Sequence, residues 1–239
     1  MIQVHKLAVI PRRFQTAAKL AVTKILEQPN VIGFVLAGSV AQGTSDEHSD
    51  LDFYVVTDGQ QRWRLCWILD GISVEVFFNP FGYLRLHLGN DAAGLHILAT
   101  GIAVLEHPEL EKLQNEAREL LSRSPKAQGR ATLEFDRFNT MECVFDMRSV
   151  IGKQSYGFLM PQALDFIVKA LYRKNRWWEV KPKLILDDLE HRSPKLARLV
   201  SLALKGESQN IQQIALETLA LEIVNPLQQI EFSSDPQTV

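Results

Sequence analysis

Two short apolar runs, separated by a small-residue turn and a polar loop, constrain this chain more than any other feature. Residues 31–36 (VIGFVL) and 51–56 (LDFYVV) are rich in β-branched and aromatic side chains. Such runs, bounded by turn-forming residues, are typical of buried strands. The sequence between them, AGSVAQGTSDEHSD, is small and polar. We therefore predict two strands, near 31–37 and 51–56, joined by a tight turn and a loop.

Two carboxylates lie at the start of the second run. Asp50 and Asp52 are two residues apart, so they share one face of a strand, about 6.6 Å apart along the backbone. Neighbouring acids repel each other and are costly to desolvate, and a cation offsets both effects. Hard oxygen ligands suit Mg²⁺, which takes one or two protein carboxylates and completes its shell with water and phosphate oxygens.

The small residues of the turn favour the binding of an anion. Gly38 and Gly43 let backbone N–H groups approach a phosphate closely, and Ser39 adds a hydroxyl donor. The segment between the glycines can open a short helix whose N-terminus faces the phosphates. A structural alternative is an Asx turn capped by Ser49, with the acids at the surface.

A third acid occupies the next predicted strand, 72–78. In GISVEVFF the apolar side chains alternate, and Glu75 is a lone carboxylate in an otherwise apolar run. If this strand lies beside Asp50 and Asp52, the three acids converge on one site; an exposed position on an edge strand is the alternative for Glu75.

The pattern G-S-x-A-x-G, then S-D-x-D, then apolar-Glu-apolar resembles the nucleotidyltransferase superfamily related to DNA polymerase β. Within it, the Glu and a helical C-terminal half most resemble the aminoglycoside and lincosamide adenylyltransferases. The resemblance implies that Asp50 and Asp52 bind two Mg²⁺ ions. It implies that Glu75 either completes the metal site or deprotonates the acceptor hydroxyl.

The same resemblance implies a nucleotide-binding set and ATP as the donor. A later segment, RWWEVKPK, is similar to the family's aromatic-then-Pro-Lys segment, in which a Lys of the helical domain reaches the triphosphate. The expected nucleotide-binding residues are Gly38, Ser39, Gly43, Ser49 and Lys183.

Composition narrows the classes of partner. The 239 residues carry a net charge of −2, with 46% apolar and 23% charged residues, so nucleic acid is an unexpected partner. Cys66 and Cys143 are far apart without metal-ligand spacing, which favours buried thiols in a reducing compartment. No signal peptide and no membrane span are expected, so we expect a cytoplasmic protein.

The predicted fold class is α+β, with a small mixed-sheet domain, residues 1–124, followed by a helical bundle, residues 125–239. The polar segment 122–130 marks the boundary. In the first domain we predict a helix over 12–27, a connector over 58–70 (helical from Gln60), helical structure within 85–100, a strand over 101–106 and a helix from Pro108. In the second we predict helices over 132–151, 161–173, 182–191, 194–204 and 208–224.

Four acids on one predicted helix are candidates for a cationic acceptor, although a solvated helix face is the favoured explanation. They are Glu134, Asp136, Glu142 and Asp146. Trp177 and Trp178 can stack on a ring or fill a core. Arg173 falls at a helix C-terminus, where a structural role is as good an explanation as phosphate binding.

The predicted function is Mg²⁺-dependent transfer of a nucleoside monophosphate, AMP from ATP, to a hydroxyl of a small-molecule acceptor such as an aminoglycoside-like antibiotic. Two alternatives stay open: transfer to a protein or RNA acceptor, as in toxin–antitoxin systems, and a regulatory module that binds nucleotide without transferring it. A homodimer is compatible with the sequence.

Overall fold

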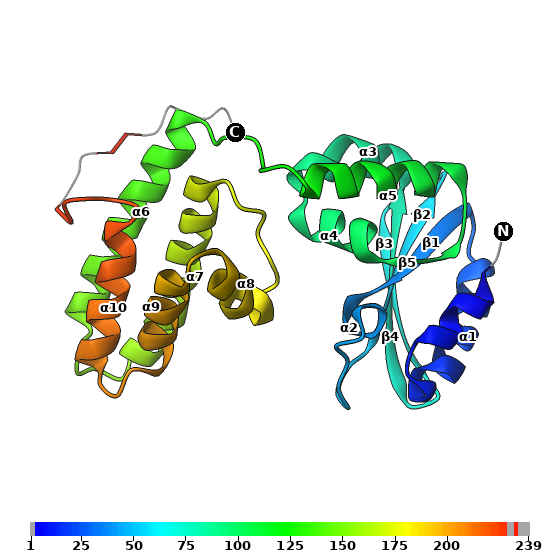
Figure 1. The fold of residues 1–239 in the computed structure, drawn as a ribbon, viewed down its shortest axis with the longest axis horizontal. Helices are drawn as coiled ribbons and strands as arrows, with labels where there is room; N and C mark the ends of the chain where they lie inside the picture. The colour runs from blue at the N-terminus through cyan, green and yellow to red at the C-terminus, as the bar shows by residue number, and fades with distance from the viewer. Residues whose placement is uncertain (1–2, 229–231, 234–239) are drawn as a thin grey trace. The chain divides into compact units, whose positions relative to one another are not determined.

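The computed structural model describes residues 3–228 and 232–233. The chain divides into two compact units, Met1–Arg123 and Ser124–Val239. The first contains a mixed sheet with helices, and the described part of the second contains helices (Figure 1). The predicted α+β class is confirmed.

The first unit is built on a five-stranded sheet in the order β3-β4-β2-β1-β5. Its central pair, β2 and β4, is parallel, and the other neighbouring pairs are antiparallel. The parallel register places Asp52 directly opposite Glu75. The strands are β1 (Val31–Ala37), β2 (Leu51–Thr57), β3 (Trp63–Leu69), β4 (Ile72–Pro80) and β5 (Ile102–Leu105).

Helices cover the two faces of this sheet differently. The face that carries Phe53 and Val76 packs against α1 in a continuous apolar core. The opposite face is approached by α4 and α5, since Gly101, just after α4, lies against Val35 and Leu110 of α5 lies against Gly33. The helices of this unit are η1 (Val4–Val9), α1 (Arg12–Leu26), α2 (Gly38–Gln42), α3 (Phe81–His87), η2 (Leu88–Asn90), α4 (Ala92–Thr100) and α5 (Pro108–Leu121).

The predicted connector over 58–70 is wrong, because β3 occupies most of it. Its apolar residues Trp63, Leu65, Trp67 and Leu69 alternate and pack against the core that contains α1. Strand β3 is joined to β4 by Asp70 and Gly71, both at positive φ (50° and 72°). An Asp-Gly pair between alternating apolar residues is a strong hairpin signal, because this turn matches the twist of the strands.

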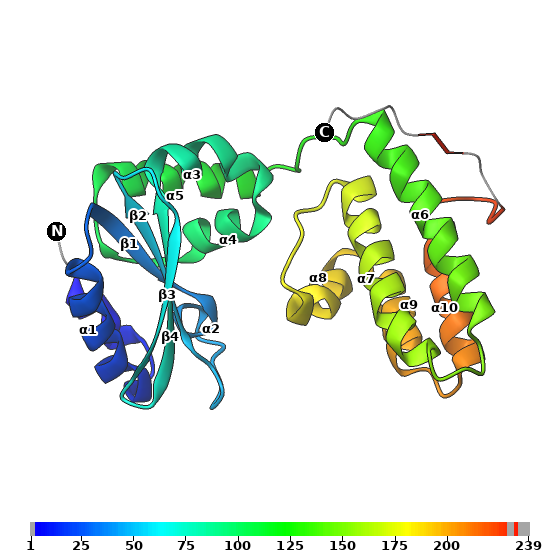
Figure 2. The same ribbon diagram turned by 180° about the vertical axis from the view of Figure 1, so that it is seen from behind.

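The second unit is a helical bundle around one apolar core. Figure 2 shows α6, α7, α9 and α10 running side by side. Helix α7 begins at Tyr156 and contains Pro161, so the expected start at Pro161 is wrong. The helices are α6 (Arg130–Ser149), α7 (Tyr156–Asn175), η3 (Pro182–Leu184), α8 (Ile185–Arg192), α9 (Pro194–Lys205) and α10 (Gln209–Leu221).

A buried ion pair ties α6 to α7. Asp136 accepts two hydrogen bonds from the Arg173 guanidinium, of 2.7 and 2.8 Å, and its side chain is 5% exposed. Arg173 also reaches Glu179, at 3.4 Å. Asp136 is therefore excluded as an acidic contact for an acceptor, and the structural explanation of Arg173 is confirmed.

The two cysteines differ in exposure. Cys66 lies on β3 and is exposed, so the expectation of a buried thiol is wrong there. Cys143 is half-buried, and this burial raises the pKa of its thiol. In the described part of the chain, none of the helices has the length and apolar character needed to span a bilayer.

Candidate active site

The turn after β1 presses against the acids of β2. Gly38 has φ of +72°, and a Cβ at this position would lie 2.4 Å from Oδ2 of Asp52. Any other residue at this position would therefore meet both a strained backbone and a collision with the carboxylate. Gly38 lets the turn pass directly over Asp52.

Gly43 ends α2 in a different way. It also has φ of +72°, but a Cβ there would meet no atom within 4 Å. The left-handed conformation alone explains glycine here, as at many helix C-termini. Helix α2 has five residues, so its dipole is small.

Hydrogen bonds fold the loop between α2 and β2 back on the turn. The Ser39 hydroxyl donates to Ser49 Oγ over 3.1 Å. Ser49 Oγ in turn accepts from the backbone N–H of Asp46 (2.9 Å) and donates to Asp46 Oδ1 (3.0 Å). These hydrogen bonds connect Ser39 to Ser49, the residue that precedes Asp50. The bonds between Ser49 and Asp46 also form a turn of the kind that the structural alternative predicts.

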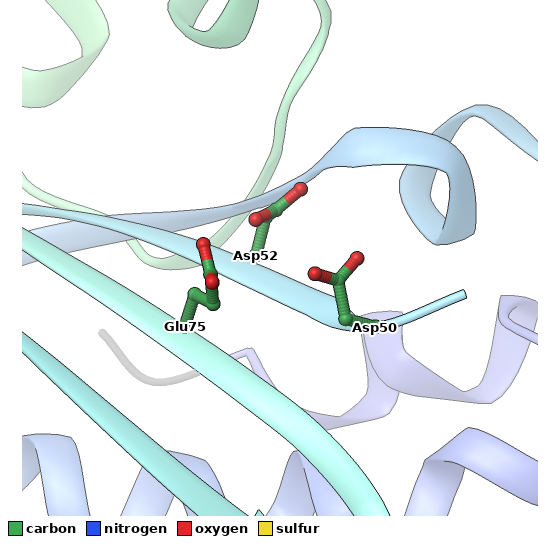
Figure 3. A group of neighbouring side chains, drawn as sticks. All are labelled: Asp50, Asp52 and Glu75. Atoms are coloured by element: carbon green, nitrogen blue, oxygen red, sulfur yellow. The ribbon is translucent and has the colours of Figure 1, made fainter. Parts of the chain in front are cut away.

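The three acids converge. One carboxylate oxygen each from Asp50, Asp52 and Glu75 lie within 4.8 Å of one another, and all three residues are partly buried. Figure 3 shows the carboxylates of the two aspartates and of Glu75, which extends from the neighbouring strand, on the same side of the sheet. Glu75 lies on β4, which has a partner strand on each side, so the edge-strand alternative is wrong.

The donor set fits a divalent cation. Oxygens about 2.1 Å from a Mg²⁺ ion lie at most about 4.2 Å from one another across the octahedron. Adjacent ligand oxygens of such an ion lie only about 3.0 Å apart, so the three oxygens, which lie within 4.8 Å of one another, would draw closer together when they bind one ion. Three carboxylate oxygens are hard ligands of the type that Mg²⁺ and Mn²⁺ prefer.

An arginine that the sequence analysis missed borders the acids. Arg64 on β3 donates a hydrogen bond from Nη2 to Oε1 of Glu75. This hydrogen bond is the main cause that raises the pKa of the Arg64 guanidinium. The alternation within β3 and the Asp-Gly turn after it were the signals that could have located Arg64 on this face.

Tyr54 extends the acid-bearing face toward the helices. It lies two residues after Asp52 on β2, and burial raises the pKa of its phenol, with a further contribution from Asp91. The neutral phenol is therefore a hydrogen-bonding group and not a base at physiological pH.

Lys183 belongs to the second unit, where it lies in η3 and is exposed. In the first unit the structure places Gly38 against Asp52 and Ser39 against Ser49. It also brings the three acids together, whereas Gly43 lies at the end of α2. Trp177 of the second unit packs edge-on against Tyr172 and contacts the bundle core, which favours its structural role.

Comparison with known proteins agrees with this geometry. The sequence profile of the family described as "Nucleotidyltransferase domain" matches residues 21–140, which include the turn, the acids and the whole sheet. No curated protein sequence matches this chain.

One solved structure of similar fold is a nucleotidyltransferase-like protein from Exiguobacterium sibiricum 255-15. Its TM-score is 0.50 at 15% identity, over 86% of this chain and 74% of that one. At this low sequence identity, the similarity is evidence for a shared fold alone.

The mixed sheet, the glycine turn and the clustered acids all lie within the part of the chain that the family model matches. The chain belongs to the nucleotidyltransferase domain family.

Proposed function

We propose that this protein is a metal-dependent nucleotidyltransferase that transfers AMP from ATP to a hydroxyl of a small-molecule acceptor. One observation carries the proposal: an oxygen from each of Asp50, Asp52 and Glu75 lies within 4.8 Å of the other two. Three ionised carboxylates this close repel one another, and a divalent cation offsets that repulsion.

In this proposal the three acids have different roles. Asp50 and Asp52 would hold two Mg²⁺ ions, with Glu75 as a further ligand or as the group that takes the hydroxyl proton. Bound Mg²⁺ would supply Lewis-acid activation of the hydroxyl and charge stabilisation of the departing pyrophosphate.

The turn and the loop would hold the nucleotide. The backbone around Gly38 and the Ser39 hydroxyl would contact the phosphates, and Ser49, hydrogen-bonded to Ser39, would orient that hydroxyl. Gly43 would allow the turn to close, and Lys183 of the helical unit would neutralise phosphate charge.

The choice of acceptor rests on charge and on resemblance. A net charge of −2 favours a small molecule over a nucleic acid. The resemblance to antibiotic adenylyltransferases makes aminoglycosides and lincosamides the first acceptors to examine, with the helical unit as the acceptor-binding part.

Label transfer tests the proposal. The purified protein is incubated with α-³²P-ATP, Mg²⁺ and a panel of hydroxylated acceptors, and products are identified by mass spectrometry as acceptor plus AMP. The Asp52→Asn variant, in which one ligand charge is lost, should abolish transfer without lowering the melting temperature, because the loss of this charge relieves repulsion among the acids.

Two results would contradict the proposal. Equal transfer by the wild type and Asp52→Asn would remove the acids from the chemistry. Metal-dependent ATP binding without transfer to any small molecule, protein or RNA acceptor would indicate a nucleotide-binding regulatory module.

A further inference from the structure

Strand β3 presents a cation to the acid-bearing face of the sheet. In the β3–β4 register, Cys66 lies opposite Glu75 and Arg64 lies opposite Phe77. Side chains at directly opposite positions share a face. Arg64 and Phe77 are therefore on the same face as Glu75, whose partner on its other side is Asp52.

Contacts with Glu75 and Phe77 orient the Arg64 guanidinium. Its Nη2 donates to Oε1 of Glu75, and its Cζ lies 4.9 Å from the centre of the Phe77 ring. A guanidinium is planar and presents several donors in a fixed fork, so a ring on one side and a carboxylate at its edge define its orientation. The Phe77 ring and the Glu75 carboxylate together therefore define the orientation of the Arg64 guanidinium.

Stability does not account for this arrangement. The Arg64 side chain is 51% exposed and that of Glu75 is 27% exposed, and ion pairs of this exposure contribute little to folding. A positive charge beside a proposed cation site is also unfavourable, since it repels the ion. Arg64 at this position calls for another explanation.

We propose that Arg64 is a positioning residue for the metal site. By occupying Oε1 of Glu75, it fixes the carboxylate in one orientation and leaves the second oxygen for a divalent cation shared with Asp50 and Asp52. Hydrogen-bonded partners of metal ligands act in this way in many sites, and their loss weakens metal binding. This inference rests on the proposed function, because it assigns a role within the same metal site.

For the removal of the Arg64 side chain, a positioning role and simple charge repulsion predict opposite changes in metal affinity. Removing one positive charge about 5 Å from a divalent ion, in water-like surroundings, would strengthen metal binding on the order of tenfold. Losing the oriented carboxylate would instead weaken metal affinity by roughly 10–100-fold. The direction of the change therefore separates the two explanations.

Mn²⁺ is a suitable probe, because its free form is measured directly by electron paramagnetic resonance. We would titrate Mn²⁺ into the full-length wild type and into Arg64→Ala, Arg64→Lys and Phe77→Leu, without nucleotide. Lys24→Ala is the matched control: Lys24 lies over the Trp67 ring of the same strand but on the α1 side, away from the acids. Melting temperatures of all variants establish that they fold.

The expected result is Mn²⁺ binding weakened 10–100-fold in Arg64→Ala, partly restored in Arg64→Lys, and weakened less in Phe77→Leu. Lys24→Ala should bind like the wild type. Unchanged or tighter binding by folded Arg64→Ala would overturn the positioning role and leave the proposed function intact. A wild type that binds no Mn²⁺, alone or with ATP, would overturn the metal site itself.

Discussion

Substituting Gly38 with alanine tests the link between the turn and the acids. The new Cβ would lie 2.4 Å from Asp52 Oδ2, and side-chain carbons essentially never approach closer than 3.0 Å. The carboxylate must therefore move by about 0.6 Å. The positive φ of 72° adds a backbone cost of about 1–2 kcal/mol for a residue with a Cβ.

These two effects are measured separately. The backbone cost should lower the melting temperature of the first unit, Met1–Arg123, by about 4–8 °C. If Asp52 is a metal ligand, as proposed, its displacement should weaken Mg²⁺-dependent ATP binding by roughly 10–100-fold, the loss typical when the groups that orient a metal ligand are disturbed. Calorimetric titration of ATP at fixed Mg²⁺ gives the second quantity without knowledge of the acceptor.

Gly43→Ala is the matched control. It has the same φ of 72°, but its Cβ meets no atom within 4 Å. We expect the same loss of stability and no comparable loss of ATP affinity. Equal ATP affinity in the two variants, whether high or low, would refute the claim that Gly38 makes room for Asp52.

Three other outcomes follow from the side-chain contacts. Glu75→Gln should slow turnover at least ~100-fold, whether the lost charge serves a metal ion or a proton transfer. The loss of ATP affinity should be smaller than the loss of turnover, and a wild-type kcat on an identified acceptor would contradict this prediction. Asp136→Ala should destabilise the helical unit by about 2–4 kcal/mol in urea titrations, because Arg173, which is largely buried, loses its two shortest hydrogen bonds and keeps the longer contact with Glu179; a loss near zero would show that the pair is solvated. The Arg148 guanidinium lowers the pKa of Glu217 below its usual 4.5, so the pair stabilises the fold above that pH and ceases to do so on acidification. Arg148→Met should therefore reduce stability at pH 7 and have little effect near pH 2, and an equal effect at both would count against it.

The strands of the site could be predicted from the sequence because their signals are local. Residues 31–37 and 72–78 carry uninterrupted apolar or alternating patterns, and the predicted strands agree with β1 and β4. Leu51 begins β2 as expected. The convergence of Asp52 with Glu75 depends on the parallel pairing of β2 with β4. The sequence predicts this convergence only if the two strands are neighbours, and no local pattern shows that they are.

The missed features depend on contacts distant in sequence or on weaker local signals. Arg64, Cys66 and the polar residues near Gly59 obscured the alternation of β3, so its edge position and the Arg64–Glu75 contact were not predicted. The pairing of Asp136 with Arg173 spans 37 residues, and no pattern within α6 distinguishes a buried acid from a solvated one. Proline favours the first turn of a helix, so the sequence predicts a start at Pro161, whereas α7 begins at Tyr156 and contains Pro161 inside.

Metal-dependent nucleotide binding tests the central claim most directly. ATP is titrated calorimetrically into the wild type and into the Asp50→Asn/Asp52→Asn double variant, with Mg²⁺ and with EDTA. The acidic cluster predicts binding by the wild type that requires Mg²⁺ and disappears in the double variant, with both proteins equally folded. ATP binding of equal strength in the double variant, or in EDTA, would contradict the assignment of these acids as the metal site of a nucleotidyltransferase.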